Sequence, residues 1–357
     1  MRVLVTGGAG FIGSTFVHHT LAAHPHDEVT TLDLLTYAGR RENLSDLAAD
    51  ARHRFVRGDI ADAAIVDELV GAADAVVNFA AETHVDRSLL DSESFVRSNV
   101  GGVLTLLEAV RRHERRMVQV STDEVYGDIE PGRFSVETDP LLPRSPYAAA
   151  KAGGELMCRA YHVSYGTDVV VTRGCNTIGP RQYPEKLVPL FVTNALRDQP
   201  LPVYGDGLQV RDWLHAEDHA AAIDVVLRRG TAGEVYNVGA GQERPNIEVV
   251  REILARLGKP ESLIVHVPDR AGHDRRYALD GGKIMRELGW CPSWTFEATL
   301  HDTVDWYVAN SAWWGAIRDD DKFATYYDTQ YQWRLDSAHL EAYPDGRRGE
   351  PADGARR

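Results

Sequence analysis

A glycine-rich stretch near the amino terminus constrains the fold of this chain more than any other feature. A short apolar strand is expected over residues 2–6, glycines follow at positions 8, 10 and 13, and an apolar-periodic helix is expected over residues 16–23. Glycines at this spacing allow a tight turn and bring the backbone close to a pyrophosphate, which then faces the amino terminus of the helix. The stretch therefore predicts a dinucleotide-binding unit made of a strand, a turn and a helix.

An acidic residue at the end of the next predicted strand strengthens this interpretation. The strand Glu28–Asp33 ends 20 residues after Gly13, the separation at which a carboxylate meets the ribose hydroxyls of adenosine. The same negative charge repels a 2′-phosphate, which favours NAD over NADP, although Arg40 and Arg41 lie close in the sequence. The combination favours a nucleotide site over the alternative of a glycine turn beside a solvated aspartate.

Strands and helices alternate along the first part of the chain. Further strands are expected at 54–58, 75–79, 117–120, 168–172 and 234–238, and helices at about 62–70, 92–113, 147–164, 217–229 and 296–310. Such βαβ units predict an α/β fold, a Rossmann-type doubly wound parallel sheet with a smaller, interleaved substrate-binding α/β domain. The expected division is 1–178 for the NAD-binding domain, with returns at about 213–240 and 295–310, then 179–212 and 241–294 for the smaller domain, and a disordered tail over 337–357.

The charge balance and the cysteine usage exclude several kinds of partner. The 357 residues include 39 Lys and Arg against 53 Asp and Glu, a net charge of −14, which argues against nucleic acid or an anionic membrane as the main partner. Cys158, Cys175 and Cys291 form no Cys-x-x-Cys pair, so neither a disulfide framework nor a zinc site is expected. No metal site, export signal or membrane span is predicted, and the expected location is cytoplasmic.

Two groups of residues carry the expected chemistry. Thr122, Asp123 and Glu124 follow the apolar run 117–120, and ligands of open α/β sheets bind at the carboxyl ends of strands. Tyr147 and Lys151 lie four residues apart in an alanine-rich segment, so they share one helix face. A phenol with an ordinary pKa of about 10 becomes a base near neutrality only beside a cation, which Lys151 is expected to supply. With Thr122 holding the substrate oxygen beside a nicotinamide, the arrangement predicts oxidation of an alcohol to a ketone.

The adjacent carboxyl groups of Asp123 and Glu124 indicate a second step. Adjacent acids in a loop are usually solvated, but in a partly dry pocket their pKa values move apart, which leaves one group protonated and the other ionised. Oxidation at one sugar carbon acidifies the proton on the neighbouring carbon, so a base there and an acid at the next hydroxyl would eliminate water. The pair therefore predicts a dehydratase.

Further residues are assigned to the cofactor by their positions after predicted strands. Asp59 and Ile60 follow the third strand, where a polar side chain meets adenine, and small residues after the fourth strand let the backbone approach the cofactor. The expected cofactor-binding set is Gly7, Gly10, Phe11, Ile12, Gly13, Asp33, Thr36, Asp59, Ile60, Ala80, Ala81, Thr83, Asn99, Tyr147 and Lys151. Residues 128–146 are expected to form a loop over the site, and Asn246 to cap a helix over residues 247–257.

Six linked motifs accompany the glycine stretch and the Tyr147–Lys151 pair. They are LDLLTYAG (32–39), AAETHVDRS (80–88), STDEVYG (121–127), PEKL (184–187), YGDGLQVRDWLH (204–215) and DRAGHDRRYALD (269–280). Together with the TGGAGFIG opening they resemble the extended short-chain dehydrogenase/reductases that act on nucleotide sugars. The closer resemblance is to the dTDP-glucose 4,6-dehydratases, and it covers residues 1 to about 335.

The resemblance implies a cycle without net oxidation. Tyr147 takes the proton of the sugar 4-hydroxyl while NAD takes the C4 hydride, Glu124 removes the C5 proton, and Asp123 protonates the departing C6 hydroxyl. Hydride return to C6 gives the 4-keto-6-deoxy sugar. The implied substrate-binding set is His84, Arg87, Thr122, Asn176, Lys186, Tyr204, Arg211, Asn246, Arg270 and His273, with Arg211 and Arg270 at the pyrophosphate. A homodimer is also implied, to which the helices at 92–113 and 147–164 would lend apolar faces.

One segment departs from the family pattern and leaves alternatives open. Residues 174–180 read Gly-Cys-Asn-Thr-Ile-Gly-Pro where the family typically reads Cys-Ser-Asn-Asn-Tyr-Gly-Pro, so an aromatic residue beside the nucleotide is lost. The expected substrate is dTDP-glucose. A dehydratase of UDP-glucose or another nucleotide sugar, a 4-epimerase, and a dinucleotide-sensing protein with an inactive site are the alternatives. Trp313, Trp314, Tyr326 and Tyr327 are interpreted as packing residues of a carboxyl-terminal segment.

Overall fold

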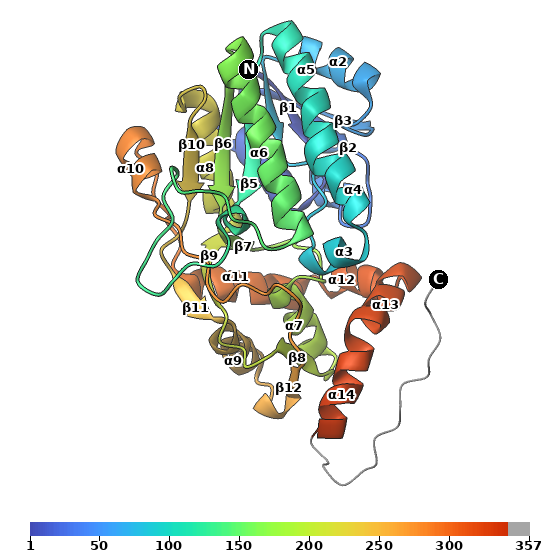
Figure 1. The fold of residues 1–357 in the computed structure, drawn as a ribbon. Helices are drawn as coiled ribbons and strands as arrows, with labels where there is room; N and C mark the ends of the chain where they lie inside the picture. The colour runs from blue at the N-terminus through green and yellow to red at the C-terminus, as the bar shows by residue number, and fades with distance from the viewer. Residues whose placement is uncertain (342–357) are drawn as a thin grey trace, which may run out of the picture.

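A seven-stranded parallel sheet forms the centre of the larger domain in the computed structural model, which describes residues 1–341 (Figure 1). The strand order is β10-β6-β5-β4-β1-β2-β3, and every neighbouring pair is parallel. The strands are β1 (Arg2–Thr6), β2 (Glu28–Asp33), β3 (His53–Arg57), β4 (Ala75–Asn78), β5 (Arg116–Thr122), β6 (Val169–Gly174) and β10 (Val235–Val238). The chain order reverses at β1, as in a doubly wound sheet, so the predicted fold class is confirmed.

Helices cover both faces of this sheet, and the strand residues alternate between the two cores. Val3 and Val5 pack with α1 (Phe11–Ala23) and α8 (Ala216–Arg229), whereas Leu4 packs with α2 (Ala63–Ala72), α5 (Val103–His113) and α6 (Pro146–Tyr165). This alternation follows from the two-residue period of a strand. The helix expected over 92–113 is confirmed: α4 (Ser92–Val96) continues through a π-helical turn, Arg97–Gly102, into α5 without a break. Beside them lies α3 (Val85–Leu90), and α1 begins five residues before the expected start.

The smaller domain has its own core and is built from later parts of the chain. Its strands are β7 (Asn176–Ile178), β9 (Val210–His215) and β11 (Glu243–Pro245) in one sheet, and β8 (Leu201–Tyr204) and β12 (Ile264–Val267) in another. Its helices are α7 (Leu187–Leu196), α9 (Asn246–Leu257) and α11 (Phe296–Ala309). Two expected assignments differ from this arrangement. The buried face of α11 packs in the smaller core, not the larger one, while α10 (Gly282–Leu288) packs on the larger core.

The chain continues after α11 into a helical carboxyl-terminal segment. It comprises α12 (Ser311–Arg318), α13 (Asp321–Tyr327), a π-helical turn (Asp328–Gln332) and α14 (Trp333–Glu341), which lie at the end of the smaller domain (Figure 1). The tail expected from residue 337 is therefore helical up to Glu341, and its remainder lies outside the described residues. Within residues 1–341, no helix has both the length and the apolar character needed to cross a bilayer.

The loop between β5 and α6 does not lie over the site as expected. The backbone N–H groups of Ile129 and Ser135 donate to the carbonyls of Arg276 and Ala278, and the Arg276 guanidinium donates to the carbonyls of Glu130 and Arg133. None of residues 128–145, all of which the structure describes, lines the two cavities described below. The loop instead braces the segment around Arg276, which borders the substrate side of the site.

Candidate active site

A cavity of about 360 Å³ lies at the carboxyl ends of the parallel strands. The glycine turn forms one wall and leaves no room for side chains: Gly7 has a φ of +69°, and a Cβ there would lie 2.5 Å from the amide nitrogen of Ala80. A Cβ on Gly13 would lie 2.3 Å from the carbonyl oxygen of Gly7. The expected cofactor residues that line this cavity are Gly7, Gly10, Phe11, Ile12, Gly13, Asp33, Thr36, Asp59, Ile60, Ala80, Ala81, Thr83, Tyr147 and Lys151. This cradle fits a dinucleotide whose pyrophosphate lies against the glycine turn.

Asp33 is held rigidly at the edge of this cavity. Its carboxylate accepts hydrogen bonds from the backbone N–H groups of Ala9 (2.9 Å) and Leu35 (2.8 Å). Burial raises the pKa of Asp33, and these two bonds oppose that rise. Arg40 pairs with Glu42 and Arg41 lies over the Phe55 ring, so neither arginine lines the cavity. The arrangement suits ribose hydroxyls, and neither Arg40 nor Arg41 is placed to bind a 2′-phosphate.

Asn99 supports the cavity wall from behind and is not part of its lining. Its carboxamide accepts from the backbone N–H of Glu82 and donates to the carbonyl of the same residue, both at 3.0 Å. These two bonds fix the strand end that carries Ala80, Ala81 and Thr83. Asn99 therefore supports the wall of the cofactor cavity, and its expected contact with the cofactor stays a prediction.

The end of β5 brings the expected catalytic hydroxyl and carboxyl groups into the same cavity. Thr122 is the last residue of β5, and its hydroxyl accepts a hydrogen bond from the backbone N–H of Glu124 at 3.3 Å. The same hydroxyl donates to Asp123 at 3.2 Å. Asp123 is 3% exposed, and its other carboxyl oxygen has no hydrogen-bond partner among the described residues. Glu124 borders this cavity and the neighbouring one.

The first turns of α6 present Tyr147 and Lys151 to the cavity. The helix begins sharply, because the Ser145 hydroxyl caps the N–H of Ala148 at 3.1 Å and Pro146 fixes the first helical residue. The Lys151 ammonium, however, donates to the carbonyl of Val120 at 2.7 Å and is not among the groups that shift the Tyr147 pKa. Burial and Glu124 raise the pKa of Tyr147, and only the Thr122 hydroxyl lowers it. In the protein alone, the expected stabilisation of a phenolate by Lys151 is thus not seen, because the lysine side chain reaches toward β5.

Burial raises the pKa values of both adjacent carboxyl groups, but their charged neighbours differ. Burial and the charge of Glu124 raise the pKa of Asp123 to about 8, so this group is protonated at neutral pH. Burial also raises the pKa of Glu124, but Arg270, Lys186 and Arg211 oppose the rise by stabilising its carboxylate. The site therefore places a protonated carboxyl group, Asp123, beside a second carboxyl group, Glu124, that faces cations.

A second cavity, of about 160 Å³, lies between β5 and the smaller domain. The expected substrate residues that line it are His84, Asn176, Lys186, Tyr204, Arg211, Asn246, Arg270 and His273. The two cavities meet at Glu124, because they share as lining residues Glu124, Asn176, Thr177, Gln182, Glu185 and Lys186. Three cations face this cavity in a chain of net charge −14, which suits a small anionic ligand.

Two expected substrate residues, Arg87 and Thr122, do not line the second cavity, and the helix cap predicted at Asn246 is wrong. Arg87 lines neither cavity, because its guanidinium lies between the rings of Tyr37 (4.1 Å) and Tyr326 (4.0 Å) and pairs with Glu185. Thr122 lines only the cofactor cavity. Asn246 lines the substrate cavity as expected, but it is the first residue of α9 and its side chain makes no capping bond, so the predicted cap is wrong.

Sequence reasoning missed several residues of the second cavity. Tyr277 is 2% exposed, and its hydroxyl donates to Asp274 at 2.5 Å and lies 3.5 Å from Glu124. Glu185 and Asp86 also line the cavity. These three residues lie inside the motifs DRAGHDRRYALD, PEKL and AAETHVDRS, and the motifs could have identified them as site residues. Tyr331, from the carboxyl-terminal segment, lies outside every motif.

Residues 174–180, which depart from the family pattern, lie between the two cavities. A Cβ on Gly174 would lie 2.5 Å from the His219 ring, and the Thr177 hydroxyl hydrogen-bonds with His219 at 2.8 Å. Ile178 is 2% exposed and packs in the smaller core while it borders the substrate cavity. Gly174 and Thr177, which both differ from the family pattern, therefore pack against the same buried side chain, His219.

Known proteins share this arrangement over most of the chain. The sequence model described as GDP-mannose 4,6 dehydratase matches residues 4–303. The chain is 52% identical to a dTDP-glucose 4,6-dehydratase of Streptomyces niveus, over 90% of this chain and 97% of that protein. It is 53% identical to the low-salt glycan biosynthesis protein Agl12 of Haloferax volcanii, over 87% and 99% of the two chains. The crystal structure of DesIV, a dTDP-glucose 4,6-dehydratase of Streptomyces venezuelae with NAD and TYD bound, matches with a TM-score of 0.87 and 53% identity over 89% of this chain and all of that one.

Proposed function

The chain belongs to the GDP-mannose 4,6-dehydratase family and within it to the dTDP-glucose 4,6-dehydratases, and on this basis we propose that it converts dTDP-glucose to dTDP-4-keto-6-deoxyglucose with NAD as cofactor. The observation that carries the proposal is the adjacent pair Asp123 and Glu124: Asp123 is protonated at neutral pH and lines the first cavity, and Glu124 faces cations and lines both cavities. A 4-epimerase would need the tyrosine and the cofactor but not this pair.

The first cavity would hold NAD. The glycine turn and the amino terminus of α1 would bind the pyrophosphate, and Asp33 would bind the adenosine ribose, while Tyr147 and Lys151 line the same cavity. Bound NAD supplies a hydride acceptor for C4 of the sugar and a hydride donor for C6. The chain itself supplies the binding, the orientation and every proton transfer.

The residues at the end of β5 and the start of α6 divide the proton transfers among them. Tyr147 removes the proton of the 4-hydroxyl, and Thr122 holds the same oxygen by a hydrogen bond. Glu124 then takes the C5 proton, which the C4 ketone has made acidic. Asp123, protonated at neutral pH, gives its proton to the C6 oxygen, which leaves as water. The C5–H and C6–O bonds break and a C5=C6 double bond forms, which is later reduced at C6 and protonated at C5.

The second cavity holds the nucleotide sugar. Arg211 and Arg270 face the diphosphate, and Lys186, whose ammonium donates to the carbonyl of Thr83 at 2.7 Å, lies between the sugar and the cofactor cavity. Burial, Arg270 and Arg211 lower the pKa of His273 to about 4, so this side chain is neutral and contributes hydrogen bonds without charge.

The test is to incubate the purified protein with dTDP-glucose and to follow proton NMR for a new C6 methyl signal. We expect the methyl signal to appear, and the Glu124→Gln variant to retain C4 oxidation, seen as absorbance of reduced nicotinamide, but to form no methyl group. Undiminished product from that variant would contradict the assignment of the base. Wild-type protein with added NAD could instead form no product from dTDP-glucose but form product from UDP-glucose. In that case the proposed nucleotide of the substrate is wrong, and the proposed reaction type stands.

We also propose that the protein works as a homodimer in the cytoplasm. The helices α3, α4 and α6 carry large apolar side chains that are exposed in the single chain, including Leu90 (64%), Val96 (56%), Leu156 (56%) and Val163 (71%). Covering such a patch by a second copy would remove it from water, which stabilises association. Cys158, Cys175 and Cys291 are free, as is usual in a reducing compartment.

A further inference from the structure

The helical segment after residue 303, where the family match ends, is packed firmly onto the smaller domain. Phe323, Tyr331 and Leu335 belong to the core of that domain. The Arg318 guanidinium is buried and donates to side chains of α7, to Thr193 at 2.9 Å and Asn194 at 2.7 Å. The segment therefore has a fixed position relative to the substrate cavity.

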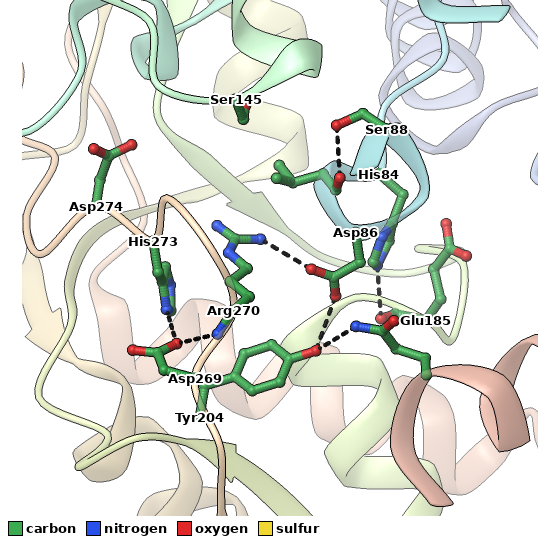
Figure 2. Close-up of polar contacts among 12 residues, drawn as sticks. His84, Asp86, Ser88, Ser145, Glu185, Tyr204, Asp269, Arg270, His273 and Asp274 are labelled. Atoms are coloured by element: carbon green, nitrogen blue, oxygen red, sulfur yellow. Dashed lines mark hydrogen bonds and ion pairs between the residues drawn. The ribbon is translucent and has the colours of Figure 1, made fainter. Parts of the chain in front are cut away.

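From this segment, Gln330 reaches the polar cluster at the cavity wall. Its carboxamide nitrogen donates to the Tyr204 hydroxyl at 2.8 Å. Figure 2 shows the same hydroxyl beside the Asp86 carboxylate, to which it donates at 3.0 Å. The direction follows from the groups themselves, because a carboxylate only accepts and a phenol has one proton. Gln330 is 6% exposed and Asp86 is 3% exposed. Tyr331 stacks on the Tyr204 ring at 6.1 Å and also lines the cavity.

Asp86 in turn faces Arg270 without a close contact. The nearest carboxylate oxygen of Asp86 lies 3.6 Å from the guanidinium, which is too long for a hydrogen bond (Figure 2). Both that oxygen and the Nε of Arg270 are buried and have no hydrogen-bond partner among residues 1–341. Burial opposes ionisation, yet His84 and Arg270 hold the pKa of Asp86 below its ordinary value, so the carboxylate is charged. The hydrogen bond from Tyr204 thus holds Asp86 back from a close pair with the arginine.

A close pair would change what Arg270 offers to a ligand. Arginine and a carboxylate prefer two parallel hydrogen bonds, and in that geometry the guanidinium loses the edge with which it binds phosphate oxygens. In the observed arrangement the charge of Arg270 is balanced by Asp86 while its N–H groups stay free. The orientation of the Tyr204 hydroxyl decides between the two arrangements, and Gln330 sets that orientation.

We propose that the carboxyl-terminal segment is a wall of the nucleotide-sugar cavity and that Gln330 is a positioning residue, which acts through Tyr204 and Asp86 to keep Arg270 free for the diphosphate of the substrate. The inference rests on the proposed function, since it takes the ligand of this cavity to be a nucleoside diphosphate sugar. It extends the site to a part of the chain beyond residue 303, where the match to the family sequence model ends.

The test compares Gln330→Met with Gln332→Met, which alters the same turn at an exposed side chain that bonds only to Asp336. For each holoenzyme we would measure dTDP affinity by calorimetry, KM and kcat for dTDP-glucose, and the melting temperature. We expect Gln330→Met to weaken dTDP binding and raise KM roughly five- to tenfold, the effect of one buried hydrogen bond, with kcat changed less than about twofold. Gln332→Met should match the wild type.

Equal dTDP affinities in the two variants would overturn the inference, and so would a fall in kcat with unchanged KM. If Gln330→Met does not fold, Tyr204→Phe tests the same relay, because it keeps the ring and removes only the hydroxyl; unchanged dTDP affinity in that variant would also overturn it. Failure of the proposed function gives a different result. In that case the wild-type protein itself neither binds dTDP nor converts dTDP-glucose.

Discussion

At the scale of single residues, the proton on Asp123 decides the pH range of the reaction. Burial and Glu124 raise the pKa of Asp123 to about 8, and burial lowers the pKa of Lys151 to about 8, with Glu155 acting in the opposite direction. Below this pH both groups keep the proton that the proposed function requires: Asp123 as the acid, and Lys151 as the cation expected to support the Tyr147 phenolate once cofactor and substrate are bound. We therefore expect kcat to be flat near neutrality and to fall as pH rises through about 8. A kcat profile that keeps rising to pH ~10, the ordinary tyrosine pKa, would contradict the role of Asp123 as the acid.

A buried ion pair behind Lys151 supports a second prediction. Glu155 is 3% exposed and pairs with Arg173, itself 5% exposed, at 2.8 Å. Glu155→Gln would leave the arginine charge buried without a partner, so we expect a loss of about 3–5 kcal/mol in the free energy of unfolding, measured with urea. The loss of the carboxylate also lowers the pKa of Lys151, which moves the alkaline fall in activity to lower pH. The double variant Glu155→Gln/Arg173→Met should recover stability but not the pH profile. A single variant as stable as the wild type would exclude this account.

At the scale of elements, the start of α6 places Tyr147 in the site. Ser145→Ala removes the cap of this helix and is expected to cost about 1 kcal/mol of stability. Thr295→Ala is the matched control, since Thr295 caps α11 through the N–H of Ala298 at 3.2 Å in the smaller domain. Both variants should lose similar stability, measured by urea unfolding, but only Ser145→Ala should lower kcat, because the first turn of α6 carries the tyrosine. Equal kcat values in the two variants would show that the cap does not position Tyr147.

Features that depend on residues nearby in the chain could be predicted from the sequence, and features that depend on residues far away in the chain could not. The glycine turn, the acid at Asp33 and the order of strands and helices depend on neighbours in the chain, and the sequence patterns predicted them. The position of Arg87 between Tyr37 and Tyr326 depends on rings 50 and 239 residues away, and no local pattern contains it. Asn246 looks like a cap in sequence, yet its side chain serves the cavity and not the helix end.

At the scale of the whole molecule, the core against which a helix packs also depends on residues far away in the chain. The helices α10 and α11 follow one another in the chain, but α10 packs on the larger core and α11 on the smaller one. A helix with one apolar face shows the same apolar periodicity whichever core it packs against. The expected domain division placed both incorrectly, because a sequence pattern shows that a face is buried but not against what. The same limit applies to the apolar faces of α3, α4 and α6, which the single chain leaves exposed.

The exposed apolar face of α6 is predicted to form part of the contact between two copies of the chain. Leu156 and Val163 lie seven residues apart on α6, hence on one side of the helix, and are 56% and 71% exposed. If a second copy covers them, Leu156→Glu/Val163→Glu places two charges in an apolar interface, and light scattering after gel filtration should show a monomer where the wild type is a dimer. Leu142→Glu is the control, because Leu142 is 63% exposed but lies in the loop between β5 and α6, away from these helices. A dimer that survives the double substitution, or a wild type that is already monomeric, would exclude pairing through α6. The monomer should still bind NAD, since Leu156 and Val163 line neither cavity, and this separates loss of the interface from loss of the fold.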